Sequence, residues 1–166
     1  MALDLLYRLV MFVALLLAQV LILNHVHIFG VATPLLYVYF VVTFHRNFPR
    51  WIILLSSFLL GLLIDIFSST PGLAAGCMTL VAFVQPYLVE LMAPRDSAED
   101  LEVSAATFGW SKFSTLSILI VSLYCLVFFA LEAFSFFEWL VWMERAVASG
   151  LLTWVLMMGL ESVRSK

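Results

Sequence analysis

Residues 61–72 read GLLIDIFSSTPG and place one aspartate, Asp65, inside an apolar run that ends in turn-forming residues. A charged side chain at the centre of a membrane-spanning helix costs about 2.5 to 3.5 kcal/mol on insertion scales. Such a carboxylate must therefore lie near a helix end, have a partner or face a polar cavity. Counting about 1.5 Å per residue from Trp51 places Asp65 roughly one turn from the end of its helix. The stretch predicts a helical hairpin with a carboxylate at its closed end.

The composition of the whole chain is that of a membrane protein. Of the 166 residues, 64% are hydrophobic and 11% are charged, and the mean hydropathy is +1.12. A soluble domain of this size and composition would aggregate. We therefore expect an all-α, polytopic single domain over residues 1–166, embedded in a lipid bilayer. The net charge is -3 and the basic residues are scattered, so nucleic acid is not an expected partner.

A membrane-spanning helix needs about 20 apolar residues, or fewer where the bilayer thins. Six segments meet this criterion, and the second is short, with Pro34 near its start. The sixth contains Glu144 and Arg145, so the alternative there is an interfacial helix through residues 136–143 followed by a shorter span. The expected spans are residues 5–23, 31–44, 51–67, 73–92, 113–131 and 140–160, with a loop at residues 93–111.

The distribution of lysine and arginine predicts the orientation, because these residues accumulate in cytoplasmic loops. With six spans, all but one of them fall on the same side, and Arg145 is the exception. We therefore expect both termini and the 93–111 loop to lie in the cytoplasm. The residues on this side are Arg8, Arg46, Arg50, Arg95, Lys112, Arg164 and Lys166.

The turn after Asp65 carries the residues that begin a new helix. Thr70 is expected as the N-cap of the following helix and Pro71 as its first residue. Asp65 then lies within reach of the free amides and positive dipole end of that helix, or of the hydroxyls of Ser68 and Ser69. The alternative is a polar contact with another protein.

Small residues mark two faces for close helix packing. Ser57, Gly61 and Asp65 recur every four residues and form one stripe, and Gly72 and Gly76 form a GxxxG step on the next helix. Small residues allow helix backbones to approach closely in lipid. The spacing does not decide whether the neighbouring helix belongs to this chain or to a partner.

The remaining polar residues near the span ends are expected to make structural contacts. Gln19 and Asn24 can hydrogen-bond across helices. Glu132 lies near the last external turn, where Arg145 can offset a glutamate. His25 and His27 have no further ligands nearby in the sequence, so no metal site is expected.

The sequence lacks the residue sets that catalysis would need. Asp65 is the only aspartate within a span, so the two carboxylates of an aspartyl peptidase are missing. The chain has no GxSxG turn, no HExxH and no phosphate-binding loop. We expect neither an enzyme nor a bound cofactor.

The stretch GLLIDIFSSTPGLAAGCMTLVAFV, at residues 61–84, resembles the MreD family of rod shape-determining proteins. The residues that carry the resemblance are Gly61, Asp65, Pro71 and Gly72, and the layout of spans agrees over most of the chain. The short second span and the acidic stretch at residues 96–102 depart from the family pattern.

The resemblance implies a non-enzymatic subunit of the bacterial cell-elongation machinery in the inner membrane. Its implied partners are MreC, the MreB filament, the glycan polymerase RodA and a class B penicillin-binding transpeptidase, which together support peptidoglycan synthesis and cell shape. The family is similar in helical arrangement to the substrate-binding subunits of energy-coupling-factor vitamin transporters. The alternative function is therefore that of a small-molecule binding subunit of a transporter, with an external cavity that holds the ligand.

Overall fold

The computed structural model describes residues 2–26, 32–95, 101–134 and 138–166, and all the elements in these ranges are helical. Five helices are long and apolar enough to cross a membrane. The first begins as α1 (Ala2–Leu17) and continues to His25 as a π-helical stretch (Ala18–Ile22) and a 3-10 turn (Leu23–His25). The others are α3 (Arg50–Ser68), α4 (Leu73–Met92), α6 (Trp110–Ala133) and α7 (Trp139–Arg164).

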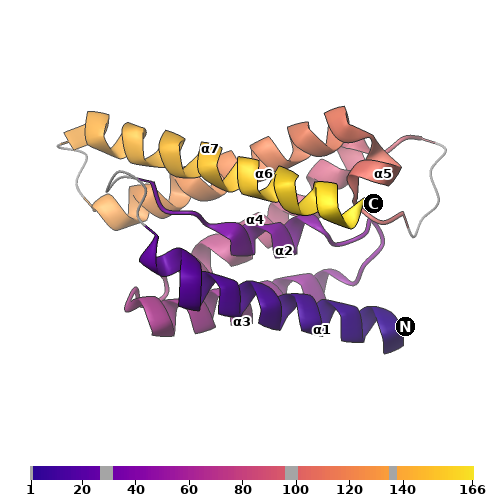
Figure 1. The fold of residues 1–166 in the computed structure, drawn as a ribbon, viewed down its shortest axis with the longest axis horizontal. Helices are drawn as coiled ribbons and strands as arrows, with labels where there is room; N and C mark the ends of the chain where they lie inside the picture. The colour runs from indigo at the N-terminus through magenta and orange to yellow at the C-terminus, as the bar shows by residue number, and fades with distance from the viewer. Residues whose placement is uncertain (1, 27–31, 96–100, 135–137) are drawn as a thin grey trace.

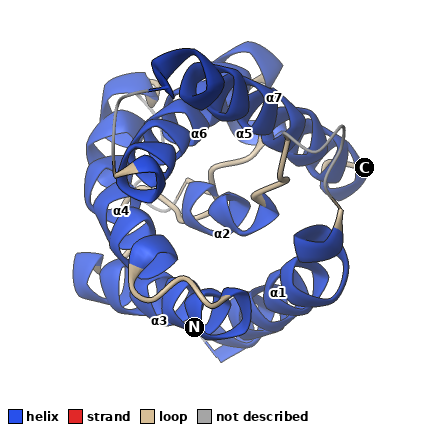
Figure 2. Cartoon of the chain, turned by 90° about the vertical axis from the view of Figure 1, so that its left-hand side faces the viewer, coloured by secondary structure: helices blue, strands red, loops and turns tan. Residues whose placement is uncertain are grey.

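The long helices run roughly parallel or antiparallel to one another (Figure 1). Viewed along the bundle, they form a ring around the short helix α2 (Tyr39–Val42) (Figure 2). Both termini lie at the same end of the bundle in Figure 1. We call this the basic end, because most of the arginines lie there, as their contacts and the pocket that they line indicate. They are Arg8, Arg46, Arg50, Arg95 and Arg164.

The segment predicted as the second span is not a continuous helix. Its described part contains only a 3-10 turn (Leu36–Val38) and α2, and residue 31 lies outside the described residues. All side chains from Leu35 to Phe44 are buried inside the protein. Hydropathy suggested a span here because an apolar run that faces other helices looks the same as one that faces lipid.

This broken segment still runs from one end of the bundle to the other, antiparallel to α1. Near its start, the side chain of Gln19 contacts Pro34, and in its middle the rings of Phe12 and Phe40 pack 5.7 Å apart. At its end, Arg8 Nη2 donates to His45 Nδ1 at 2.9 Å. The segment therefore lies along the centre of the bundle, and we call it the central segment.

Polar side chains of the surrounding helices satisfy the backbone of this segment. Gln19 donates to the Pro34 carbonyl at 2.9 Å and accepts from the Leu36 amide at 3.2 Å. Thr153 of α7 accepts from the Leu35 amide at 3.0 Å, and Gln85 of α4 donates to the Phe44 carbonyl at 3.1 Å. Non-helical backbone at membrane depth is tolerated only where protein or water pairs it. Here the partners come from the π-helical stretch after α1, from α4 and from α7.

The last helix and the 93–111 loop can also be compared with the sequence-based expectations. Helix α7 is continuous over 26 residues, so no break separates residues 139–143 from the rest of the helix. The 93–111 loop contains a short helix, α5 (Ala105–Phe108), which Ser104 caps by accepting from the Thr107 amide. Asp96, Glu99 and Asp100 lie outside the described residues.

Candidate functional site

Asp65 joins α3 to the start of α4. Its side chain is 3% exposed, and its two carboxylate oxygens accept three hydrogen bonds. Oδ1 accepts from Thr70 Oγ1 and from the Ala74 amide, both at 2.8 Å, and Oδ2 accepts from the Ala75 amide at 2.9 Å. The expected contact with the first amides of α4 is present, where the helix dipole also favours a negative charge. Both oxygens of this carboxylate therefore help to close the hairpin.

The turn itself differs from the prediction in which Thr70 caps the helix and Pro71 begins it. Helix α4 begins at Leu73, and Gly72 is its N-cap with φ of +79°. Because Asp65 already pairs with the amides that a capping hydroxyl would take, Thr70 donates its hydroxyl to Asp65 instead. Ser68 accepts a hydrogen bond from Asn24, and Ser69, the C-cap after α3, lies in the left-handed region with φ of 58°.

The two small-residue motifs behave differently. Gly61 lies directly against α4, because a Cβ at this position would be 2.6 Å from Ala75 Cα. Ser57 is fully buried on the same stripe. By contrast, a Cβ at Gly72 or Gly76 would have no atom within 4 Å. The first motif packs α3 against α4, whereas the GxxxG step is not used by the described residues of this chain.

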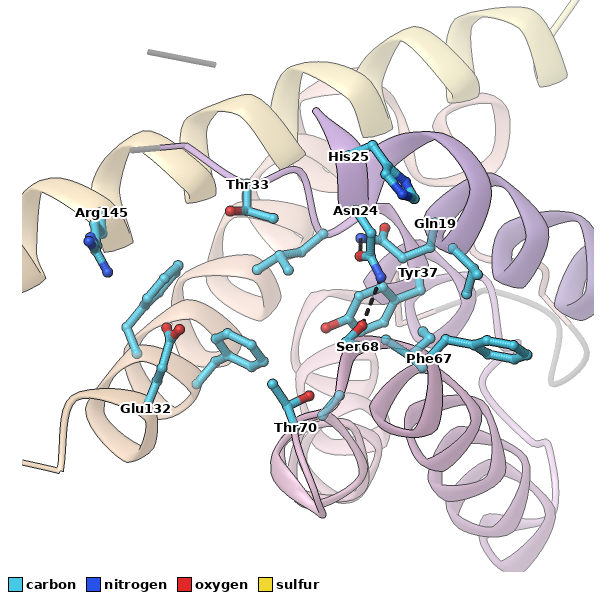
Figure 3. Close-up of a pocket in the computed structure, with 16 residues that line it drawn as sticks. Gln19, Asn24, His25, Thr33, Tyr37, Phe67, Ser68, Thr70, Glu132 and Arg145 are labelled. Atoms are coloured by element: carbon cyan, nitrogen blue, oxygen red, sulfur yellow. Dashed lines mark hydrogen bonds between the residues drawn. The ribbon is translucent and has the colours of Figure 1, made fainter. Parts of the chain in front are cut away.

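A polar cavity of about 570 Å³ lies at the end of the bundle opposite the basic end, next to the Asp65 turn. In Figure 3, Gln19 and Asn24 lie on one side of it. Asn24 Nδ2 donates to Ser68 Oγ at 2.7 Å, and Gln19 Nε2 donates to Asn24 Oδ1 at 3.0 Å. Tyr37 also lines the cavity, and its hydroxyl hydrogen-bonds to that of Tyr124. The cavity is thus bordered by the π-helical stretch and 3-10 turn that follow α1, by the end of α3 and by the central segment.

Glu132 of α6 and Arg145 of α7 lie on the other side of this cavity (Figure 3). No salt bridge joins Arg145 to a glutamate among the residues that the structure describes, so the expected offset of charge is not seen as a direct contact. His25 lines the cavity too, and His27 lies outside the described residues. The cavity thus has amide and hydroxyl groups on one wall and both signs of charge on the other.

Sequence reasoning missed a polar stripe on α7. Ser149, Thr153 and Glu161 are fully buried and, together with Met157, recur every four residues. Glu161 accepts from the Ala105 amide at 2.7 Å and from the Tyr39 hydroxyl at 2.6 Å. The spacing alone could have revealed this stripe, because polar residues four apart share a helix face.

Hydrogen bonds within the hairpin hold both carboxylate oxygens of Asp65, and the polar cavity next to them has groups that can bind a ligand. Within the described ranges, no group of three or more His, Cys, Asp or Glu could hold a metal ion. Small-molecule sites are typically cavities of about 300–1,000 Å³ with a few placed polar groups, and the hollow beside Asn24 falls in that range.

No protein-family model, curated protein or solved structure gives a significant match to this chain.

Proposed function

We propose that this protein is a non-enzymatic scaffold of the bacterial cell-elongation machinery, a relative of MreD that binds MreC through membrane helices. In this proposal MreB, RodA and a class B penicillin-binding transpeptidase belong to the same complex. The resemblance at Gly61, Asp65, Pro71 and Gly72 supports the identity. The use of Asp65 as a structural contact supports a role without catalysis.

The observation that carries the binding role is the open face of α4. Gly76, Leu80, Phe83 and Tyr87 lie four, three and four residues apart, which places them on one face of the helix, and all four are exposed. Gly76 begins this face with no neighbour within 4 Å of its missing Cβ. An exposed glycine in a membrane helix gives a partner helix room to approach closely. A different face of α4, at Ala74 and Ala75, packs against Gly61 of α3.

The proposal includes six membrane crossings and a cytoplasmic basic end. The central segment would count as the second, broken crossing, since it connects the two ends of the bundle between α1 and α3. With it, the arginines of the basic end and both termini lie on the cytoplasmic side, as the positive-inside rule requires. Reporter fusions at residues 26 and 47, on either side of the central segment, should locate to opposite sides of the membrane. A shared location would mean that the central segment does not cross, which leaves five crossings.

Co-purification of MreC with a Gly76→Leu variant tests the scaffold. Leucine at this position meets open space within the chain, so the fold should persist, but a partner helix can no longer approach closely. We expect recovery of MreC to fall about tenfold, which corresponds to about 1.4 kcal/mol. Gly159→Leu is the matched control, because Gly159 on α7 is also an exposed glycine with nothing within 4 Å. Equal loss in both variants, or in neither, would refute the docking face.

The second candidate function is a small-molecule binding subunit of a membrane transporter, and the polar cavity favours it. Gln19, Asn24, Ser68, Glu132 and Arg145 converge there, which is more than the sequence alone indicated. A ligand at a hundred times its dissociation constant adds about 2.7 kcal/mol of stability. A thermal-shift screen with vitamins on the purified protein should then give a clear shift that Asn24→Leu abolishes. A shift unaffected by Asn24→Leu would place the ligand elsewhere.

A further inference from the structure

A second cleft, of about 680 Å³, opens at the basic end of the bundle. It lies between the turn before α3 and the last turns of α4. Three arginines line it: Arg46 and Arg50, which are four residues apart, and Arg95, which follows α4. Asn47 adds an amide, and Glu90 is the one carboxylate among the described lining residues. Among the lining residues that the structure describes, guanidinium groups therefore outnumber carboxylates.

We propose that this cleft binds the phosphate group of an anionic phospholipid from the membrane leaflet at the basic end. Guanidinium groups match phosphate oxygens with two parallel hydrogen bonds, which makes arginine the residue most suited to this ligand. Basic pockets between membrane helices on the cytoplasmic side are typical places for anionic headgroups. This proposal depends on the protein lying in a membrane, and not on MreC or on the cavity beside Asn24.

Contacts within the protein hold the guanidinium group of Arg50 in a position where it can bind an anion in the cleft. Its Nη1 donates to the Tyr87 hydroxyl at 3.3 Å, and its Cζ lies 5.1 Å from the centre of the Tyr87 ring. These contacts hold the guanidinium beside the cleft at its junction with α4. Arg50 is also the first residue of α3, and its N-cap, Pro49, has no side chain that can accept from the amides of the first turn. The positive end of the helix dipole therefore adds to the charge of the arginines.

The surroundings favour a lipid over a soluble phosphate. Trp51 and Leu91 come directly after the lining residues Arg50 and Glu90 in the sequence. Their side chains are 67% and 79% exposed, and that of Tyr87 is about half exposed. In a membrane, Trp51 and Leu91 are free to contact acyl chains, and tryptophan takes positions at headgroup level. A phospholipid would thus have its phosphate in the cleft and its chains along an apolar surface that is already present. A free phosphate would use only the first of these contacts.

Native mass spectrometry of the full chain in detergent, with added phosphatidylglycerol or phosphatidylcholine, tests the proposal. We expect phosphatidylglycerol to bind more tightly to the wild type. Each of Arg46→Gln, Arg50→Gln and Arg95→Gln should weaken its binding about fivefold. Glu90→Gln should strengthen it, because this change removes the one repulsive charge. Lys112→Gln is the control for loss of one positive charge, since Lys112 is exposed on α6 and does not line the cleft.

Three results would overturn the proposal. One is equal binding of the two lipids to the wild type. Another is a loss in Lys112→Gln as large as in the arginine variants. The third is displacement of phosphatidylglycerol by equimolar inorganic phosphate, which would identify a site for soluble phosphate instead. A gain in Glu90→Gln separates a direct electrostatic role from a folding defect, because a damaged fold would not bind the lipid more tightly.

Discussion

Gly61→Ala should destabilise the α3–α4 hairpin, although it adds a single methyl group. The new Cβ would lie 2.6 Å from Ala75 Cα, 2.7 Å from the Ala74 carbonyl oxygen and 2.8 Å from its carbon. These are backbone atoms, which no side-chain rotation can move. Ordinary contact begins at about 3.4 Å, so the two helices must separate by about 0.8 Å. Overpacking of this kind typically costs about 1–3 kcal/mol.

The same separation would also affect Asp65, one turn further along the same face of α3. Its bonds to the amides of Ala74 and Ala75 are 2.8 and 2.9 Å long, and a shift of about 0.8 Å takes them beyond hydrogen-bond range. We therefore expect the destabilisation to reach the upper part of the range given above. Gly61→Leu should be worse, because it adds three further carbons to the same contact.

Unfolding of the purified protein by titration with sodium dodecyl sulfate measures this loss. Gly76→Ala is the matched control: it adds the same methyl group to a helix, but into open space. We expect Gly76→Ala to equal the wild type or to exceed it slightly, since alanine is the better helix former. A Gly61→Ala variant as stable as Gly76→Ala would refute the close approach of α3 and α4.

Three further changes test other contacts of the bundle. Asp65→Asn should lower stability in the same titration by about 1.5–3 kcal/mol, because one carboxylate oxygen becomes a donor that faces another donor; an unchanged midpoint would contradict the three-bond arrangement. Gln19→Leu leaves the Leu36 amide without its acceptor, so hydrogen exchange at Leu36 should speed up while exchange within α6 stays constant; equal protection in variant and wild type would mean that Gln19 does not support the central segment. Glu161→Leu removes the acceptor of the Ala105 amide and should make the 93–111 loop more sensitive to proteolysis; an unchanged cleavage rate would argue against that anchor.

Hydropathy was sufficient to place the five long helices, because each has an apolar stretch of the required length. It was not sufficient for residues 31–44. The Val38, Val41 and Val42 side chains are fully buried among other helices, and an apolar side chain gives the same signal whether lipid or protein surrounds it. The evidence for a broken segment lay elsewhere, in Gln19 and Thr153, whose side chains pair with its backbone.

The candidate site was predictable where it depends on local spacing. Asp65 lies nine residues before Ala74, and a short turn necessarily brings it near the start of α4. Spacing does not show whether Asp65 or Thr70 accepts from these amides, because that depends on the positions of both side chains in the folded turn. The cleft at the basic end joins Arg46 to Arg95, and no spacing rule relates residues so far apart.

The central claim is that MreC binds to the open face of α4. A photo-cross-linking amino acid placed at Gly76 in growing cells tests this claim most directly, with Gly159 and Leu151 on α7 as comparison positions. We predict a cross-link to the membrane segment of MreC from Gly76, and none from Gly159 or Leu151. Cross-links from the α7 positions without one from Gly76 would contradict the claim.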